Sequence, residues 1–213
     1  MTPIITATRN RAELRGRASG MIVLGYFALA WTGWGSSAGV PAGVQIVLVA
    51  VAALAFAALV AGAVLMFRQA RALPEPDAAE REEGRRAGRR IGIRFGIVVV
   101  IEFAGIAVIA RVLAITGRTD LIPLLVCLGV GVHFFPLARL FRLPIYDRTG
   151  IALCVVAVAT ALAAPLLGLP ILWTLLPGLG AALVLFATSG AMLRAQRPWR
   201  PTLTAHERGM PQP

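Results

Sequence analysis

The sequence contains no lysine, and all 21 of its basic residues are arginine. Without lysine the chain cannot form a retinal or pyridoxal Schiff base, and it cannot supply the lysine of a phosphate-binding loop. Rhodopsin-like and nucleotide-hydrolysing proteins are therefore excluded.

Groups that carry catalysis are also scarce, with 10 acidic residues, two histidines and two cysteines. No serine has a histidine nearby in the sequence, and no cluster of His, Cys, Asp and Glu has metal-ligand spacing. We therefore expect no catalytic residues, no metal and no cofactor, and we predict that the protein is not an enzyme. Cys127 and Cys154 lie in separate apolar runs, at depths that we expect to differ, which predicts two free thiols.

Apolar residues are abundant, at 58% of the chain, and they gather in runs of the length that spans a bilayer. The fold class that this pattern predicts is an all-α membrane protein, a bundle of six transmembrane helices. One transmembrane domain, residues 19–194, would follow a polar cytoplasmic segment, residues 1–18, contain a cytoplasmic loop, residues 68–90, and precede a disordered cytoplasmic tail, residues 195–213. The predicted spans are 19–36, 44–67, 91–116, 121–141, 150–169 and 171–193.

The first run has a second interpretation as a signal peptide, because Ala28-Leu29-Ala30 matches a small-x-small cleavage site. The run nevertheless continues through Trp31 and Trp34, which suit the aromatic belt of a membrane interface. We therefore expect a retained first helix.

The arginines are distributed unevenly along the chain. Those in the N-terminal segment, the second-to-third connection, the fourth-to-fifth connection and the tail make 18 of the 21, and all of these segments would lie on one side. Arginine is retained on the cytoplasmic side of short loops, so we predict the cytoplasmic (inner) membrane of a bacterium, with both termini in the cytoplasm. The same placement explains the net charge of +11 without a nucleic-acid partner.

A weak repeat accompanies this distribution, because each odd run begins with an Arg–Gly step and each even run ends in Arg followed by Pro. Three helical hairpins from an ancestral triplication are one interpretation. The other is that every cytoplasmic helix end requires arginine and a helix breaker, and both remain open.

Glu102 and His133 are the only acidic residue and the only histidine deep inside apolar runs. Glu102 lies 16 residues before Arg118, in the tight turn, and His133 lies 15 residues after it. Both should lie about 23 Å from that turn, at one depth in the membrane. Intramembrane ionisable residues are functional candidates by default, so we identify these two as the polar midplane site. The sequence does not determine whether they face each other.

Two further groups of residues lie near this site in the sequence. Arg111 would lie about 13 Å from Glu102 along the helix and on its other face, so we expect it to reach the outer interface or pair with Asp120. Gly129 and Gly131 would admit a close neighbour, and Pro136 would kink the helix beside His133. Together these features predict a cavity or an ordinary bend.

The block HFFPLA at residues 133–138, followed by FRLPIY at 141–146 and by Gly150, resembles an uncharacterised family of small bacterial six-helix integral membrane proteins. The resemblance covers about 20 residues. It implies a multi-pass membrane protein, and it implies no substrate and no catalytic residue.

Two functional hypotheses follow. In the first, the protein moves or senses a small solute or a proton through Glu102 and His133, as a homo-oligomer in the lipid bilayer. In the second, it is a structural or accessory subunit that packs against a partner membrane protein through small-residue helix faces.

Overall fold

The computed structural model describes residues 3–75 and 77–195 of the chain. This part contains six α-helices and one short 3-10 turn, and the predicted all-α fold is confirmed. The elements are α1 (Pro3–Ser36), α2 (Ala42–Ala72), α3 (Ala78–Ile115), η1 (Thr119–Leu121), α4 (Ile122–Phe141), α5 (Pro144–Leu167) and α6 (Leu172–Arg194).

Five of these helices, α2 to α6, are long and apolar enough to cross a membrane. The chain is therefore a multi-pass membrane protein. α1 falls outside the five by composition, because its apolar half also contains glycine, threonine and serine. It packs between α2 and α6, and Met21 and Ala28 on its inner face are fully buried. A helix with protein on two sides needs less apolar surface than one that faces lipid all round.

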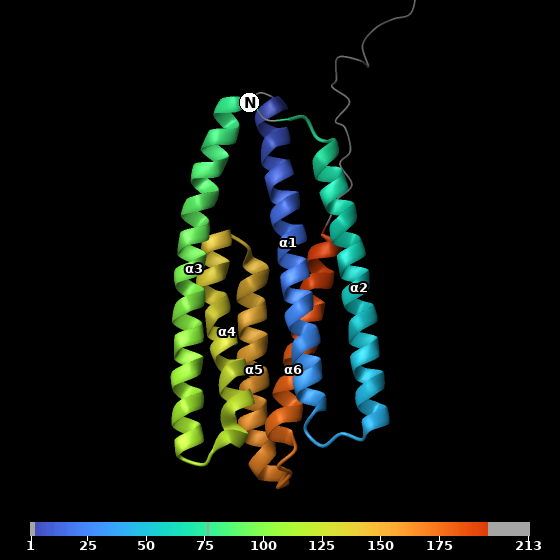
Figure 1. The fold of residues 1–213 in the computed structure, drawn as a ribbon, viewed down its shortest axis with the longest axis vertical. Coiled ribbons are helices and arrows are strands. Elements are labelled where there is room, and N and C mark those ends of the chain that lie inside the picture. Colours follow the sequence, from blue (N-terminus) through green and yellow to red (C-terminus); the bar gives the residue numbers. More distant parts are fainter. Residues whose placement is uncertain (1–2, 76, 196–213) are drawn as a thin grey trace, which may run out of the picture.

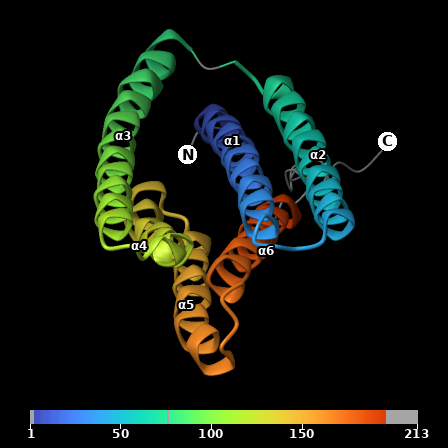
Figure 2. The same cartoon turned by 60° about the horizontal axis from the view of Figure 1, so that its bottom comes forward.

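The helices form an open arc in which the spatial order is α2, α1, α6, α5, α4, α3 (Figure 2). Each helix shares a substantial interface with its neighbours in this order. The sequence-adjacent pairs α1/α2, α3/α4 and α5/α6 all remain paired, as three hairpins would. Among the described residues α2 and α3 share no substantial interface, so they are the two edges of the arc.

Successive helices run in opposite directions, so the connections divide between the two ends of the bundle (Figure 1). The arginine-rich start of α1, the α2–α3 connection, the α4–α5 connection and the end of α6 lie at one end. The other end carries the α1–α2 connection, the α3–α4 turn with Arg118, and the α5–α6 connection.

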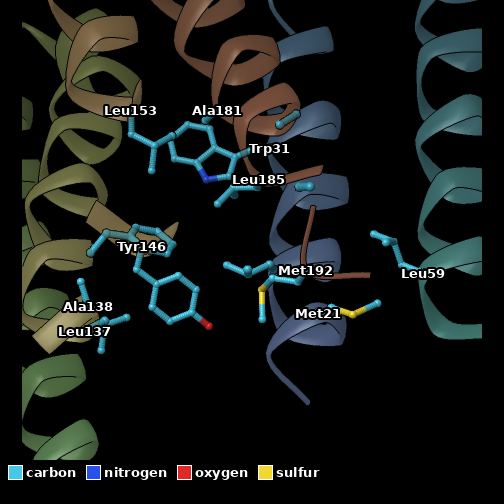
Figure 3. Packing of buried hydrophobic residues seen from close by; sticks show 14 of the residues in the cluster. Met21, Trp31, Leu59, Leu137, Ala138, Tyr146, Leu153, Ala181, Leu185 and Met192 are labelled. Atoms are coloured by element: carbon cyan, nitrogen blue, oxygen red, sulfur yellow. The ribbon is translucent and has the colours of Figure 1, made fainter. Parts of the chain in front are cut away.

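The buried core extends along the interfaces of five helices, and α3 contributes no buried residue to it. Met21 of α1, Tyr146 of α5 and Met192 of α6 lie together at the arginine-rich end of this core (Figure 3). The hydroxyl of Tyr146 comes so close to α1 that a Cβ at Gly20 would lie 3.1 Å from it. α3 therefore lies outside the core and packs on α4 and on the η1 turn that leads into it.

The closest approach of two backbones is between α1 and α6. A Cβ built on Gly178 would lie 2.2 Å from Cα of Gly35, and one built on Gly35 would lie 2.8 Å from Cα of Gly178. Only a pair of glycines allows this contact, which is the small-residue packing common between membrane helices.

The predicted connection at 68–90 is mostly helical in the structure. α2 continues to Ala72, and α3 begins at Ala78, leaving five residues between them. Asp77 and Glu80 form a reciprocal capping box that satisfies backbone N–H groups at the start of α3, an arrangement worth about 1 kcal/mol. Glu82 forms ion pairs with Arg85 and Arg86, one turn further along the same helix.

Two other predicted boundaries differ. The N-terminal segment 1–18 is helical from Pro3 onward, and α5 begins at Pro144, where the missing N–H of proline is tolerated in the first turn. The predicted disordered tail, apart from Ala195, lies outside the described residues.

Candidate functional site

The α3–α4 hairpin places the two midplane residues. α3 ends in a tight turn, in which Gly117 adopts a φ of 70° and the N–H of Arg118 donates to the carbonyl of Leu113 at 2.8 Å. A positive φ is accessible to glycine at little cost, which accounts for glycine at this position. After η1, α4 starts with Pro123 in its first turn. Glu102 and His133 then lie at matching distances from the turn.

Glu102 lies on the face of α3 that contacts α4. The half-buried residues of this part of α3 recur every three or four positions, the spacing of one helix face, whereas the residues between them are exposed. They are Val99, Glu102, Ile106, Ala110 and Leu113. Glu102 is therefore the only polar residue of that stripe.

The structure brings the two residues together. Oε2 of Glu102 lies 3.0 Å from Nδ1 of His133, and the two side chains are 14% and 10% exposed. The contact does not have the geometry of a hydrogen bond, and Nδ1 of His133 has no hydrogen-bond partner among the described residues. The contact is thus a close carboxylate–imidazole pair with no third polar group, and the rotation left open by the sequence is resolved.

The surroundings of the pair carry no other charge close by. On α3 the nearest charged residues are Arg94 and Arg111, each about 12 Å or more away along the helix, and both are exposed. On α4 Arg139 is exposed, and the thiol of Cys127 points to α5. The charge of the pair is therefore set by its own two groups.

The two best-defined hollows of the described residues lie away from the pair, one on the outer face of α4 and α5 and the other at the start of α3. Neither is lined by Glu102 or His133, nor by Gly129, Gly131 or Pro136. Neither hollow is therefore the cavity predicted beside His133.

The two glycines of α4 differ in surroundings. A Cβ at Gly131 would lie 2.9 Å from Sγ and 3.1 Å from N of Cys154, so Gly131 does admit α5 closely. A Cβ at Gly129 would meet nothing within 4 Å, so the predicted close neighbour is absent there. Pro136 lies inside α4, which continues to Phe141, and its ring is exposed.

The predicted outer pair of Arg111 and Asp120 is not among the ion pairs of the described residues. Both side chains are exposed. The chain turns between them through Gly117, and Asp120 belongs to η1 rather than to either long helix. Arg111 is left as an exposed arginine near the end of α3.

Sequence reasoning missed two polar contacts between neighbouring helices. The thiol of Cys127 donates to the carbonyl of Leu153 at 3.6 Å, and the hydroxyls of Thr149 and Thr188 lie 2.8 Å apart between α5 and α6. The threonines were visible as polar residues in apolar runs. Leu153 precedes Cys154, and Cys154 itself lies against Gly131, about one helical turn from Cys127. Both cysteines are free, as predicted.

The interfaces α3/α4, α4/α5 and α5/α6 thus each contain one polar contact between side chains or to a carbonyl. Among these contacts only the one between α3 and α4 joins an acidic side chain to a basic one, Glu102 to His133. No group of three or more His, Cys, Asp and Glu that could hold a metal ion occurs among the described residues. The chemistry available to the Glu102–His133 pair is the exchange of a proton.

Comparison of the chain with protein-family models, with curated proteins and with solved structures finds no match, and the structure supports a six-helix all-α membrane protein without identifying a family.

Proposed function

We propose that the protein senses protons through the Glu102–His133 pair, which controls how firmly α3 packs on α4. The observation that carries the proposal is the 3.0 Å contact between the carboxylate and the imidazole in an otherwise apolar interface. α3 has no buried residue, and it packs on α4 and on the η1 turn beside it, so a change at the contact with α4 acts on the whole helix.

The pair is electrically neutral when it holds one proton. Adding a second proton leaves a net positive charge on the pair, and removing the first leaves a net negative charge. An uncompensated charge in an apolar interface is destabilising by several kcal/mol, and two such groups titrate as one coupled unit. We therefore expect α3 to be held most firmly at intermediate pH and less firmly on either side.

Sensing fits the geometry better than movement of a solute. A solute needs room beside the pair, and the best-defined hollows of the described residues do not reach it. Proton movement needs a chain of polar groups or water, and the stripe of α3 around Glu102 is apolar.

The location of the protein belongs to the same proposal. Arginine-rich segments gather at one end of the bundle, which supports a bacterial cytoplasmic membrane with both termini in the cytoplasm. The pair then lies within the membrane, where a pH change on either side would have to reach it.

Pulsed electron paramagnetic resonance tests the proposal. Spin labels at the exposed positions Ile93 of α3 and Val132 of α4, in a chain with both cysteines replaced by alanine, report the separation of the helices in vesicles. The separation should be smallest at intermediate pH and increase on either side, because net charge weakens the interface by on the order of 3 kcal/mol.

A Glu102→Gln, His133→Asn double variant is uncharged at every pH and should give one separation throughout. The matched control, Asp120→Asn, removes an exposed carboxylate from the same hairpin and should keep the pH response. A response that survives in the double variant rules the proposal out. A proton flux reported by a dye inside the vesicles, and lost in the double variant, would assign movement instead of sensing.

A second candidate function is an accessory subunit whose open edge packs against a partner membrane protein or a second copy. The arc supports it, because α3 presents apolar side chains along its outer length, among them Ile101, Phe103 and Val108. Crosslinking in native membranes that returns a defined stoichiometric partner on α3 would favour this function. Recovery of the monomer alone would rule out the accessory-subunit function.

A further inference from the structure

The outer face of α4 and α5 carries an apolar groove of about 450 Å³. Seven residues line it, and all are apolar or a thiol; they include Phe135 of α4 and Ile151, Val155 and Leu162 of α5. The groove belongs to the α4/α5 side of the bundle, and neither residue of the Glu102–His133 pair lines it.

The groove opens outward, toward what is the hydrocarbon region in a membrane. Ile151, Val155, Val158 and Leu162 recur every three or four residues, so they form one stripe of α5, and each is more than half exposed. A hollow that is apolar throughout suits a saturated hydrocarbon chain and offers nothing to a polar solute.

At one end of the groove, the stripe of α5 and the groove-lining face of α4 each continue to an arginine. Arg148 precedes Ile151 by three residues on α5, and Arg139 follows Phe135 by four residues on α4. Because α4 and α5 are antiparallel, both arginines lie at the same end of the groove, the arginine-rich end of the bundle. Both are exposed, and neither takes part in an ion pair among the described residues.

One acidic residue, Asp147, lies beside Arg148 in the sequence. Asp147 precedes Ile151 by four residues, so it lies on the same stripe of α5 as the groove residues. It is exposed and forms no ion pair among the described residues. Arg139 and Arg148 outnumber this single carboxylate, so this end of the groove keeps a net positive charge for an anionic ligand.

We propose that this groove binds an anionic phospholipid, with one acyl chain along the stripe from Ile151 to Leu162 and the phosphate between Arg139 and Arg148. Arginine binds phosphate through several N–H donors, and a basic residue near the membrane surface attracts anionic headgroups. The site is independent of the proton-sensing function, since it uses a different interface.

Photocrosslinking of the full chain in vesicles tests the site. Vesicles of phosphatidylcholine receive a trace of phosphatidylglycerol or of phosphatidylcholine with a photoreactive diazirine in the acyl chain, and crosslinked peptides are mapped by mass spectrometry. Phosphatidylglycerol should crosslink to the groove residues, and unlabelled phosphatidylglycerol should compete more strongly than unlabelled phosphatidylcholine.

Two variants separate the headgroup from the chain. Arg139→Gln with Arg148→Gln should lower the phosphatidylglycerol crosslink about fivefold or more, since one basic residue near the surface is worth about that factor. Ala159→Phe, at an exposed position in the groove, should block the crosslinks of both lipids. Arg111→Gln with Arg118→Gln, at the other end of the bundle, is the control and should change nothing.

Three results would overturn the proposal. The first is equal crosslinking by both lipids that the arginine variant leaves unchanged. The second is no crosslink in the groove from either lipid. The third is a groove occupied by a second copy, detected as a covalent dimer through Cys154, which lines the groove.

Discussion

Replacing Gly178 with alanine is expected to prevent assembly of the bundle or to destabilise it by more than about 3 kcal/mol. The new Cβ would lie 2.2 Å from Cα and 2.7 Å from N of Gly35, and backbone atoms cannot move aside as a flexible side chain can. α1 and α6 would have to separate, and their interface is one of the most extensive in the bundle. Gel filtration in detergent and thermal unfolding measure the effect.

Matched controls exist on the same two helices. A Cβ at Gly33 of α1 or at Gly190 of α6 would meet nothing within 4 Å. Alanine at either position should leave stability unchanged or raise it slightly, because alanine favours helix over glycine. If Gly178→Ala proves as stable as Gly190→Ala, the glycine contact between α1 and α6 does not exist.

The second large effect is expected at the midplane pair. Glu102→Leu alone or His133→Leu alone should each destabilise the protein by on the order of 3 kcal/mol, because each leaves an unpaired polar group in an apolar interface. The double replacement by leucine should come within about 1 kcal/mol of the original chain, since a pair replaced by apolar residues is often neutral. Reversible unfolding in mixed micelles provides the four free energies of this cycle.

The control cycle uses Arg111 and Asp120, which belong to the same hairpin, are exposed and form no ion pair in the described part of the chain. Their leucine variants should be additive. Additive effects at Glu102 and His133 would mean that the two side chains do not interact, and the proton-sensing proposal would lose its basis as well.

The depth of the midplane pair was predictable from the sequence. A four-residue polar turn around Arg118 joins two long apolar runs, so residues equally far from it along the chain must lie at one level. Glu102 and His133 satisfy this condition. Their contact was not predictable, because it depends on the rotation of each helix about its axis, which tertiary packing sets.

The rotation of each helix about its axis also determines which glycines make close contacts. Gly129 and Gly131 are equivalent in the sequence, yet only Gly131 faces α5, and which of them does so depends on the rotation of α4. Gly178 is one of two glycines in the first half of the sixth run, and the structure uses it for close contact with Gly35. A glycine in an apolar run signals close packing without identifying the partner.

The helix ends within residues 68–90 were not predictable from hydropathy. Hydropathy identifies the part of a helix that lies in the membrane, and it says nothing of where the helix begins. The segment that starts α3 is rich in alanine, arginine and glutamate, which all favour helix, and Asp77 with Glu80 caps it. The polar segment therefore forms the start of the long helix α3 instead of a separate element.

The spatial order of the helices also determines when the bundle can be completed during synthesis. α1 is synthesised before the other five helices, but one of its two main neighbours is α6, which is synthesised after them. Until α6 is made, α1, which is not among the five candidate membrane spans, has only α2 as a main partner, and its glycine face stays uncovered. Completion of the arc therefore waits for α6, in contrast to domains that fold from the N-terminus onward.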